Sequence, residues 1–396
     1  MKRLTVAVLV AVAALPTVAL GRIKLITLPV RERVEIQLDH PAATLVEEER
    51  VVPLVQGVNQ VDFSWANTRI DPNTIVFRVL GPAGGDAGQA LTVNVLSVSY
   101  PPNENALVWQ VAADRAGSAR VRISYILGGL DESFSYRAVA GRDERTLTLA
   151  QYMRVQNAAN EEFGTSNLWA GFGEAFLRPI GIAETKELLV ERFEQVPVVK
   201  TYTADLATHG YLDPAQQKLR IPMHYVLTNN AANKLGAAPL PAGKVRIFQE
   251  DGRGATAFLG EDWGKFTPVD DRMELYLGVA QDIVVKRTIA SNTRRRVAGN
   301  LFEQDVVVKY EVENFKEQEV TLDIAENLRA LRAELIGETG RDPQVDIIEG
   351  TTLGDKDPEK STLDRPLFHV KLPAAKDNKA EKIEHRLHVV FRNEWQ

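Results

Sequence analysis

The stretch KVRIFQEDGRGATAFLG, residues 244–260, decides the fold class, because apolar and polar side chains alternate around an Asp251-Gly252 turn. Alternation with a period of two residues is typical of a half-buried β-strand. An Asp-Gly pair between two such runs indicates a β-hairpin, since glycine readily adopts the positive φ that tight turns need. The sequence therefore predicts a hairpin whose strands cover 244–248 and 257–260.

The same pattern continues toward the C-terminus. Strand-like segments separated by turn residues are predicted at Met273–Leu277, Asp282–Ile289, Gln304–Asn314, Glu319–Ile324, Leu367–Leu372 and Ile383–Arg392. Ala325–Ile336 differs, because Leu328, Leu331, Leu335 and Ile336 recur at helical spacing. These apolar side chains would share one face of a helix, so we expect one short helix there.

Upstream of the hairpin the chain also consists of short alternating segments. They cover 33–38, 58–63, 91–100, 106–112 and 119–126, with turns rich in Gly, Pro and Asn between them. Short strands at this spacing are typical of a β-sandwich. Residues 184–193 fit either a short helix or a strand, and we favour a strand because Pro197 keeps the neighbouring segment extended.

These patterns predict an all-β protein of tandem β-sandwich-like domains, similar to immunoglobulin or fibronectin domains. With 396 residues and roughly 100–200 residues per domain, two to three domains are expected. We place an N-terminal sandwich at 22–145, a central β-rich domain at 146–290 and a sandwich-like C-terminal portion at 291–396. The C-terminal portion is either separate or one unit with the central domain.

The N-terminus has the pattern of a secretory signal peptide over residues 1–21. Lys2 and Arg3 precede a mostly apolar run, which Pro16 ends. Small residues before the expected cleavage between Gly21 and Arg22 fit the specificity of a signal peptidase. An uncleaved membrane anchor is the alternative, but the apolar run is at the lower limit for crossing a bilayer. We therefore expect an exported protein with no transmembrane segment after cleavage.

Composition narrows the function classes. The formal net charge of −6 argues against nucleic-acid binding, which needs a basic surface. Cysteine is absent, so disulfides and thiolate metal sites are excluded. No nucleotide-binding loop, nucleophile elbow or zinc-protease motif occurs, and no cofactor is predicted.

The histidines and one acidic loop give no metal site. His385 and His388 lie three residues apart in an expected strand, so they point to opposite faces and cannot share an ion. Residues 355–359 alternate oxygen-bearing side chains as part of a calcium loop does, but they lack its central glycine and its final bidentate glutamate. The sequence therefore predicts no metal centre.

Two charged groups remain as candidate sites. Glu261 and Asp262, beside Trp263, are a candidate acid pair for glycoside hydrolysis, which needs one protonated and one ionised carboxyl group. Arg294, Arg295 and Arg296 form the one basic run, which is either a solvated hairpin tip or a contact for an anionic lipid or acidic polysaccharide.

Several segments resemble the mucoidy-inhibitor-A-like family and its domain of unknown function 4139. The resemblance covers most of residues 45–396 and is densest from residue 240. The segments that carry it are Val52–Val61 with Ile70–Pro72, Tyr125–Leu130 with Tyr136 and Val155–Asn157, and Leu240–Ile247 with Phe258–Asp262 and Tyr310–Asn314. Asp131–Ser135 stands where that family usually has tryptophan and proline, and the coiled-coil insertion of longer members is missing. The resemblance implies β-rich domains and an association with surface polysaccharide, but it assigns no catalytic residue.

The expected function is therefore that of a non-enzymatic envelope protein that binds a partner or assists assembly. It would act in the periplasm, in the envelope or outside a bacterial cell. Its partner would be an envelope protein or a surface polysaccharide, and the sequence leaves the oligomeric state open. The alternative is an exported hydrolase of envelope polymers that uses paired carboxylates such as Glu261 and Asp262.

Overall fold

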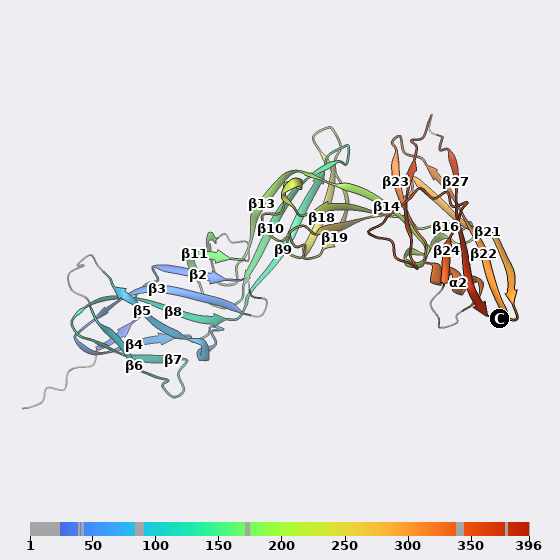
Figure 1. The fold of residues 1–396 in the computed structure, drawn as a ribbon. Helices are drawn as coiled ribbons and strands as arrows, with labels where there is room; N and C mark the ends of the chain where they lie inside the picture. Colours follow the sequence, from blue (N-terminus) through green and yellow to red (C-terminus); the bar gives the residue numbers. More distant parts are fainter. Residues whose placement is uncertain are drawn as a thin grey trace, which may run out of the picture. The chain divides into compact units, whose positions relative to one another are not determined.

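The chain forms two compact units in a computed structural model (Figure 1). The structure describes residues 24–38, 40, 43–83, 91–170, 175–337, 344–376 and 379–395. Unit 1 comprises Met1–Glu132 and Val155–Lys186, and unit 2 comprises Ser133–Arg154 and Glu187–Gln396. The predicted signal peptide at 1–21, with its cleavage between Gly21 and Arg22, lies outside the described residues.

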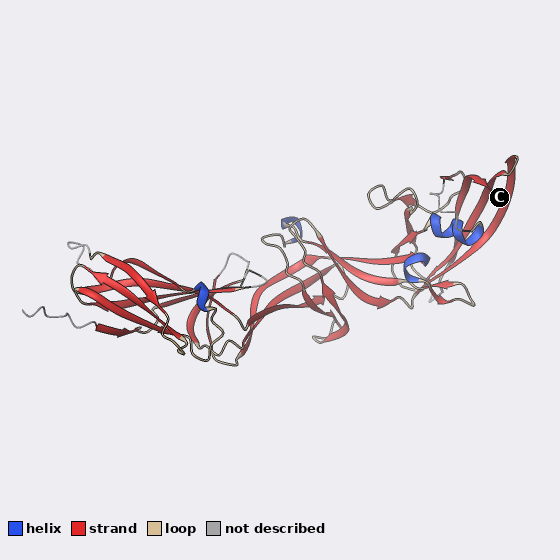
Figure 2. Ribbon diagram, turned by 90° about the horizontal axis from the view of Figure 1, so that it is seen from below, coloured by secondary structure: helices blue, strands red, loops and turns tan. Residues whose placement is uncertain are grey.

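Strands dominate both units, which confirms the predicted all-β class (Figure 2). The described residues contain two α-helices, α1 (Leu206–His209) and α2 (Leu328–Leu335). Neither has the length and apolar composition that a bilayer crossing requires.

Unit 1 is a sandwich of two sheets, with strand orders β1-β4-β7-β6 and β12-β11-β2-β3-β8-β5. The bounds are β1 (Lys24–Thr27), β2 (Arg33–Gln37), β3 (Thr44–Leu54), β4 (Gly57–Ser64), β5 (Val76–Pro82), β6 (Val93–Ser99), β7 (Ala106–Ala113), β8 (Gly117–Leu127), β11 (Phe163–Trp169) and β12 (Ala175–Ile180). The ring centroids of Phe63 on β4 and Tyr125 on β8 lie 5.9 Å apart, so the two sheets bury a common core.

The predicted hairpin belongs to the first sheet of unit 2, the central sheet, with strand order β13-β10-β9-β18-β19. The bounds are β9 (Leu130–Ala140), β10 (Thr146–Asn157), β13 (Thr185–Pro197), β18 (Gly243–Glu250) and β19 (Thr256–Gly264). Gly252 in the hairpin turn has φ +74, as its role requires. β18 pairs with β9 in parallel. A Cβ on Gly243 would lie 2.3 Å from the Phe134 carbonyl oxygen, so only glycine permits this close approach.

Two further sheets complete unit 2, with orders β20-β17-β14-β23-β26-β25 and β15-β16-β21-β22-β27-β24. The bounds are β14 (Val199–Asp205), β15 (Tyr211–Asp213), β16 (Lys218–Leu219), β17 (Pro222–Thr228), β20 (Arg272–Val279), β21 (Ile283–Ala298), β22 (Leu301–Asn314), β23 (Val320–Ala325), β24 (Gln344–Ile347), β25 (Asp355–Lys356), β26 (Leu367–Leu372) and β27 (Lys382–Trp395). One core includes Val245, Tyr225 and Leu275 from the central sheet and the β20 sheet. A second core includes Leu322, Val308 and Leu387 from the β20 sheet and the β21 sheet.

The helix predicted at 325–336 is confirmed as α2, and the strand favoured at 184–193 is confirmed as β13. α2 begins at Leu328, later than expected, because the Asn327 side chain accepts a hydrogen bond from the Ala330 backbone N–H at 2.9 Å and caps the helix. Arg332 on α2 donates two hydrogen bonds to Glu394 on β27, at 2.6 and 2.5 Å, and both side chains are buried. This ion pair fixes α2 to the β21 sheet.

The expected boundaries after residues 145 and 290 both fall inside unit 2. Residue 145 lies in the turn between β9 and β10, and residue 290 lies within β21. The chain passes between the two units within β9, β10 and β13. A division into compact units does not test whether three segments of the chain fold independently. The three-domain division therefore stays a prediction.

Candidate functional site

The arginine run lies in the last part of β21, just before the tip of the β21–β22 hairpin. β21, β22 and β27 run side by side (Figure 1). Arg295 forms an ion pair with Glu303, and the guanidinium carbon of Arg294 lies 4.0 Å from the Phe302 ring centroid. Arg296 donates to the Gly299 carbonyl at 2.7 Å. All three arginines are exposed on a regular strand and therefore alternate between its two faces.

Glu261 and Asp262 do not come together, because neighbouring residues of β19 point to opposite faces of the sheet. Glu261 accepts a hydrogen bond from Lys244 Nζ at 2.9 Å, and this bond lowers the pKa of Glu261 below its ordinary value. Asp262 accepts from the backbone N–H of Trp263 at 2.8 Å and of Tyr276 on β20 at 2.7 Å. Glu261 is thus an exposed ion-pair partner, whereas Asp262 links β19 to β20.

The structure instead groups aromatic and cationic side chains on the outer face of the central sheet. The strand registers pair Lys244 with Trp263, Arg246 with Glu261 and Phe248 with Phe258 between β18 and β19. Arg137 on β9 pairs with Arg246. Paired residues share a face. We call the following six residues the aromatic–cationic face: Arg137, Lys244, Arg246, Phe248, Phe258 and Trp263.

Direct contacts and exposure define this face further. The guanidinium carbon of Arg137 lies 4.8 Å from the Phe248 ring centroid, and the rings of Phe248 and Phe258 meet edge to face at 5.4 Å. Trp263 and Phe258 are 60% and 59% exposed, although large apolar rings are usually covered. The opposite face holds the buried Tyr136, so the sheet is anchored on one side and open on the other.

This face was not predicted from the sequence. The alternation of Lys244, Arg246 and Phe248 places these three on one side of a strand. This part of the face could have been predicted from the sequence. The parallel pairing of β18 with β9, which adds Arg137, joins segments about a hundred residues apart and leaves no local signal.

His369 lies between two carboxylates in unit 2. Its Nδ1 is 2.7 Å from Asp323 Oδ1, and its Nε2 is 3.1 Å from Asp357 Oδ2. The carboxylates bind opposite nitrogens, so they do not converge on a common point that an ion could occupy. Asp357 Oδ1 also accepts from the backbone N–H groups of Glu359 and Lys360, both at 2.8 Å. Within the described ranges no group of three His, Cys, Asp or Glu residues could hold a metal ion.

The His369 arrangement predicts a pH dependence. Partial burial lowers the pKa of His369, but the hydrogen bonds to Asp323 and Asp357 outweigh it and raise the pKa above 6.5. A raised pKa in the folded state gives a stabilisation that is complete below about pH 6.5 and is lost as the pH rises through the folded-state pKa. We expect an NMR titration to show the raised pKa of His369. Denaturation midpoints of unit 2 should fall over this range, and His369→Gln should remove that fall; an equal fall in His369→Gln would contradict the assignment.

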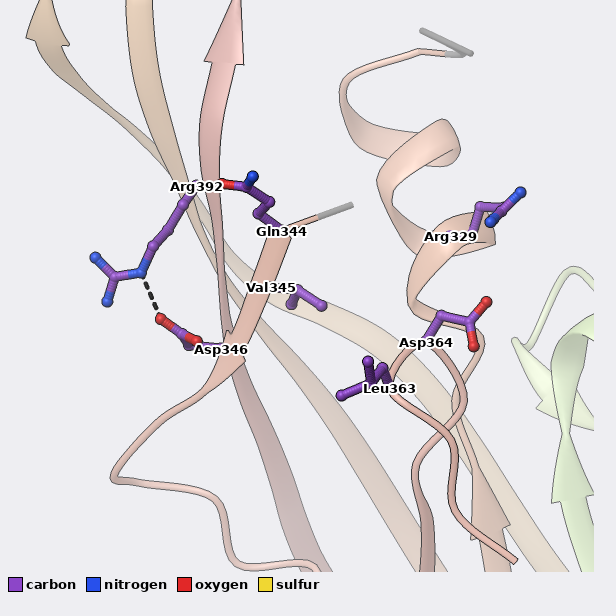
Figure 3. Close-up of a pocket in the computed structure, with 7 residues that line it drawn as sticks. All are labelled: Arg329, Gln344, Val345, Asp346, Leu363, Asp364 and Arg392. Carbon is purple, nitrogen blue, oxygen red and sulfur yellow. Dashed lines mark hydrogen bonds and ion pairs between the residues drawn. The ribbon is translucent and has the colours of Figure 1, made fainter. Parts of the chain in front are cut away.

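A cavity of about 550 Å³ lies between α2, β24, β27 and the 363–364 loop (Figure 3). Its lining residues are Arg329, Gln344, Val345, Asp346, Leu363, Asp364 and Arg392. Arg392 forms an ion pair with Asp346, and Leu363 is 94% exposed at the cavity wall. An enzyme pocket normally combines a nucleophile or general base with a closed apolar lining. The lining residues that the structure describes include no hydroxyl, thiol or imidazole group. Of their two carboxylates, Asp346 pairs with Arg392 and Asp364 accepts a hydrogen bond from the Thr362 hydroxyl at 2.8 Å.

The buried carboxylates have structural partners. The five buried acidic residues in the part of the chain that the structure describes are Glu48, Asp205, Glu326, Asp357 and Glu394. Glu48, Asp205, Glu326 and Glu394 each contact an arginine, and Asp357 contacts His369. Each carboxylate therefore already has a fixed role in holding two segments together.

No protein-family model matches this sequence, and no curated protein matches it either.

Proposed function

We propose that this chain is a non-enzymatic, exported protein of the bacterial envelope that binds an anionic surface polysaccharide. The observation that carries the proposal is the aromatic–cationic face of the central sheet. It offers exposed aromatic rings and three cations on one open surface.

The chemistry of this face fits an acidic sugar polymer. A flat aromatic ring can stack against the apolar face of a sugar, and Trp263 and Phe258 are open to such contact. The Arg137 and Arg246 guanidiniums can bind the carboxylate of a uronic acid with paired hydrogen bonds. Glu261 neutralises part of this charge, because its carboxylate lies 2.9 Å from Lys244 and 3.9 Å from Arg246, which limits the surface to moderate affinity.

The sequence supports the same proposal. The predicted signal peptide would deliver the chain to the compartment where such polymers occur. The net charge of −6 makes a local group of cations a specific feature and not a general property of the surface. The resemblance to the mucoidy-inhibitor-A-like family implies the same class of partner.

Replacing Trp263 by alanine should weaken binding to a soluble polyuronate by roughly fivefold, because one stacked aromatic contact contributes on the order of 1 kcal/mol. Isothermal titration with the polyuronate and with neutral dextran would measure this loss. Phe315→Ala is the matched control, since Phe315 is 48% exposed in the same unit but lies off the aromatic–cationic face.

A double variant R137Q/R246Q should lose affinity and most of the salt dependence of binding. Equal binding of the polyuronate by the wild type, Trp263→Ala and R137Q/R246Q would reject the proposal. Equal affinity for dextran and polyuronate would reject the anionic ligand.

A further inference from the structure

Within the part of the chain that the structure describes, one side of β21 has no neighbouring strand over most of its length. β16 pairs with β21 only at Lys218 and Lys286, and the Arg287 N–H donates to Gln217 at 3.2 Å. Beyond Arg287, β22 is the one strand that pairs with β21 among the described residues. The backbone N–H and C=O groups on the other side are therefore open to a further strand.

This open edge is both accessible and regular. Every residue from Ser291 to Asn300 is exposed, although β22 opposite alternates with buried residues such as Phe302 and Val306. The register shifts at Ala290 and Val297, and a regular ladder runs from Ser291 to Arg296 between these bulges. A segment of this length matches a typical strand of about 5–6 residues.

The arginine run determines which strand could pair there. Arg296 and Arg294 lie on the face of β21 that carries Phe302 and Gln304, and Arg295 lies on the opposite face with Glu303. An added strand would place its side chains next to all three. Consecutive acidic residues would meet a guanidinium on each face, whereas basic residues would be repelled.

A second copy of this chain is a poor partner for the same edge. Antiparallel pairing of two β21 edges would set arginines against arginines, and like charges directly opposite each other are destabilising. The existing pair between Arg295 and Glu303 is no obstacle, since the Arg295 side chain is 74% exposed and exposed ion pairs are weak.

We propose that the Ser291–Arg296 edge of β21 binds an extended, acidic segment of a partner protein as an added β-strand. This inference is independent of the polysaccharide proposal, because it concerns a different sheet and a different class of ligand. Main-chain hydrogen bonds would supply affinity, and the three arginines would select an acidic sequence.

The test uses the full chain without its signal peptide and a synthetic peptide of three consecutive glutamates flanked by valine and threonine. The peptide should protect backbone amides between Ser291 and Arg296 from hydrogen exchange. A peptide of equal charge with proline in place of the flanking valines cannot pair as a regular strand. It should bind at least about tenfold more weakly and give no protection there.

The triple variant R294Q/R295Q/R296Q should bind the glutamate peptide about tenfold to a hundredfold more weakly. The matched control is R253Q/K265Q/R272Q, which removes the same charge from exposed positions elsewhere in unit 2. Equal losses in both variants, or equal binding of the two peptides, would mean that only net charge matters and would overturn the proposal. Absence of protection on β21 with wild-type protein would overturn it as well.

Discussion

Replacing Glu326 by alanine is expected to destabilise unit 2 by about 3–5 kcal/mol, because it removes the two-point counter-ion of a buried guanidinium. The half-exposed Glu334, 3.6 Å from the same guanidinium, is too distant to replace those hydrogen bonds. Arg287 donates to the two carboxylate oxygens of Glu326 at 2.8 and 3.0 Å, and the Arg287 side chain is 2% exposed. The Tyr310 hydroxyl also donates to Glu326. Burial alone would lower the pKa of Arg287, but the attraction of Glu326 holds it above its ordinary value.

Urea denaturation followed by hydrogen-exchange mass spectrometry would measure this loss, since exchange reports on unit 2 separately from unit 1. Glu194→Ala is the matched control, because Glu194 pairs with Arg192 where both side chains are more than half exposed. Its effect should stay below about 1 kcal/mol. The double variant R287M/E326M removes both charges and should recover much of the loss. A loss in R287M/E326M as large as in Glu326→Ala would show that packing, and not the loss of the buried counter-ion, is responsible.

The fold class was predictable because it depends on local alternation. Residues 244–260 carry their own turn and their own strand pattern, and the structure has the hairpin β18–β19 there. α2 was predictable for the same reason, since its apolar spacing and its Asn327 cap are local. The neighbours of these elements were not predictable. Alternation fixes which face of a strand a residue occupies, but it does not specify that β18 lies parallel to β9.

In the candidate sites, too, the local features were predictable and the long-range strand pairings were not. The arginine run is visible directly in the sequence. Its position on an open edge depends on where β16 stops pairing with β21. The separation of Glu261 from Asp262 was predictable, because the alternation that separates His385 from His388 also separates adjacent residues. The aromatic–cationic face needed the register of three strands, which no local pattern in the sequence specifies.

Replacing Glu48 by alanine is expected to cost unit 1 about 3 kcal/mol, at the lower end of the range for breaking a buried ion pair. The Glu48 side chain is fully buried on β3, and it accepts hydrogen bonds from Arg31 and from Arg50, the latter at 3.0 and 3.1 Å. Arg31 and Arg50 are 22% and 12% exposed, so water can partly hydrate them after the substitution. This exposure is the reason to expect a smaller loss than at Glu326.

The neighbouring Glu47 provides the matched control, since it has the same chemistry on the opposite face of the same strand. Its carboxylate lies 3.7 Å from Arg122, and its side chain is 16% exposed. Glu47→Ala should therefore change the unfolding free energy of unit 1 by less than about 1 kcal/mol. The triple variant R31M/E48L/R50M replaces the charged cluster by apolar side chains and should restore much of the stability that Glu48→Ala loses. Similar losses for Glu47→Ala and Glu48→Ala would contradict the assignment, because Glu48 differs from Glu47 in its complete burial and in its hydrogen bonds to two arginines.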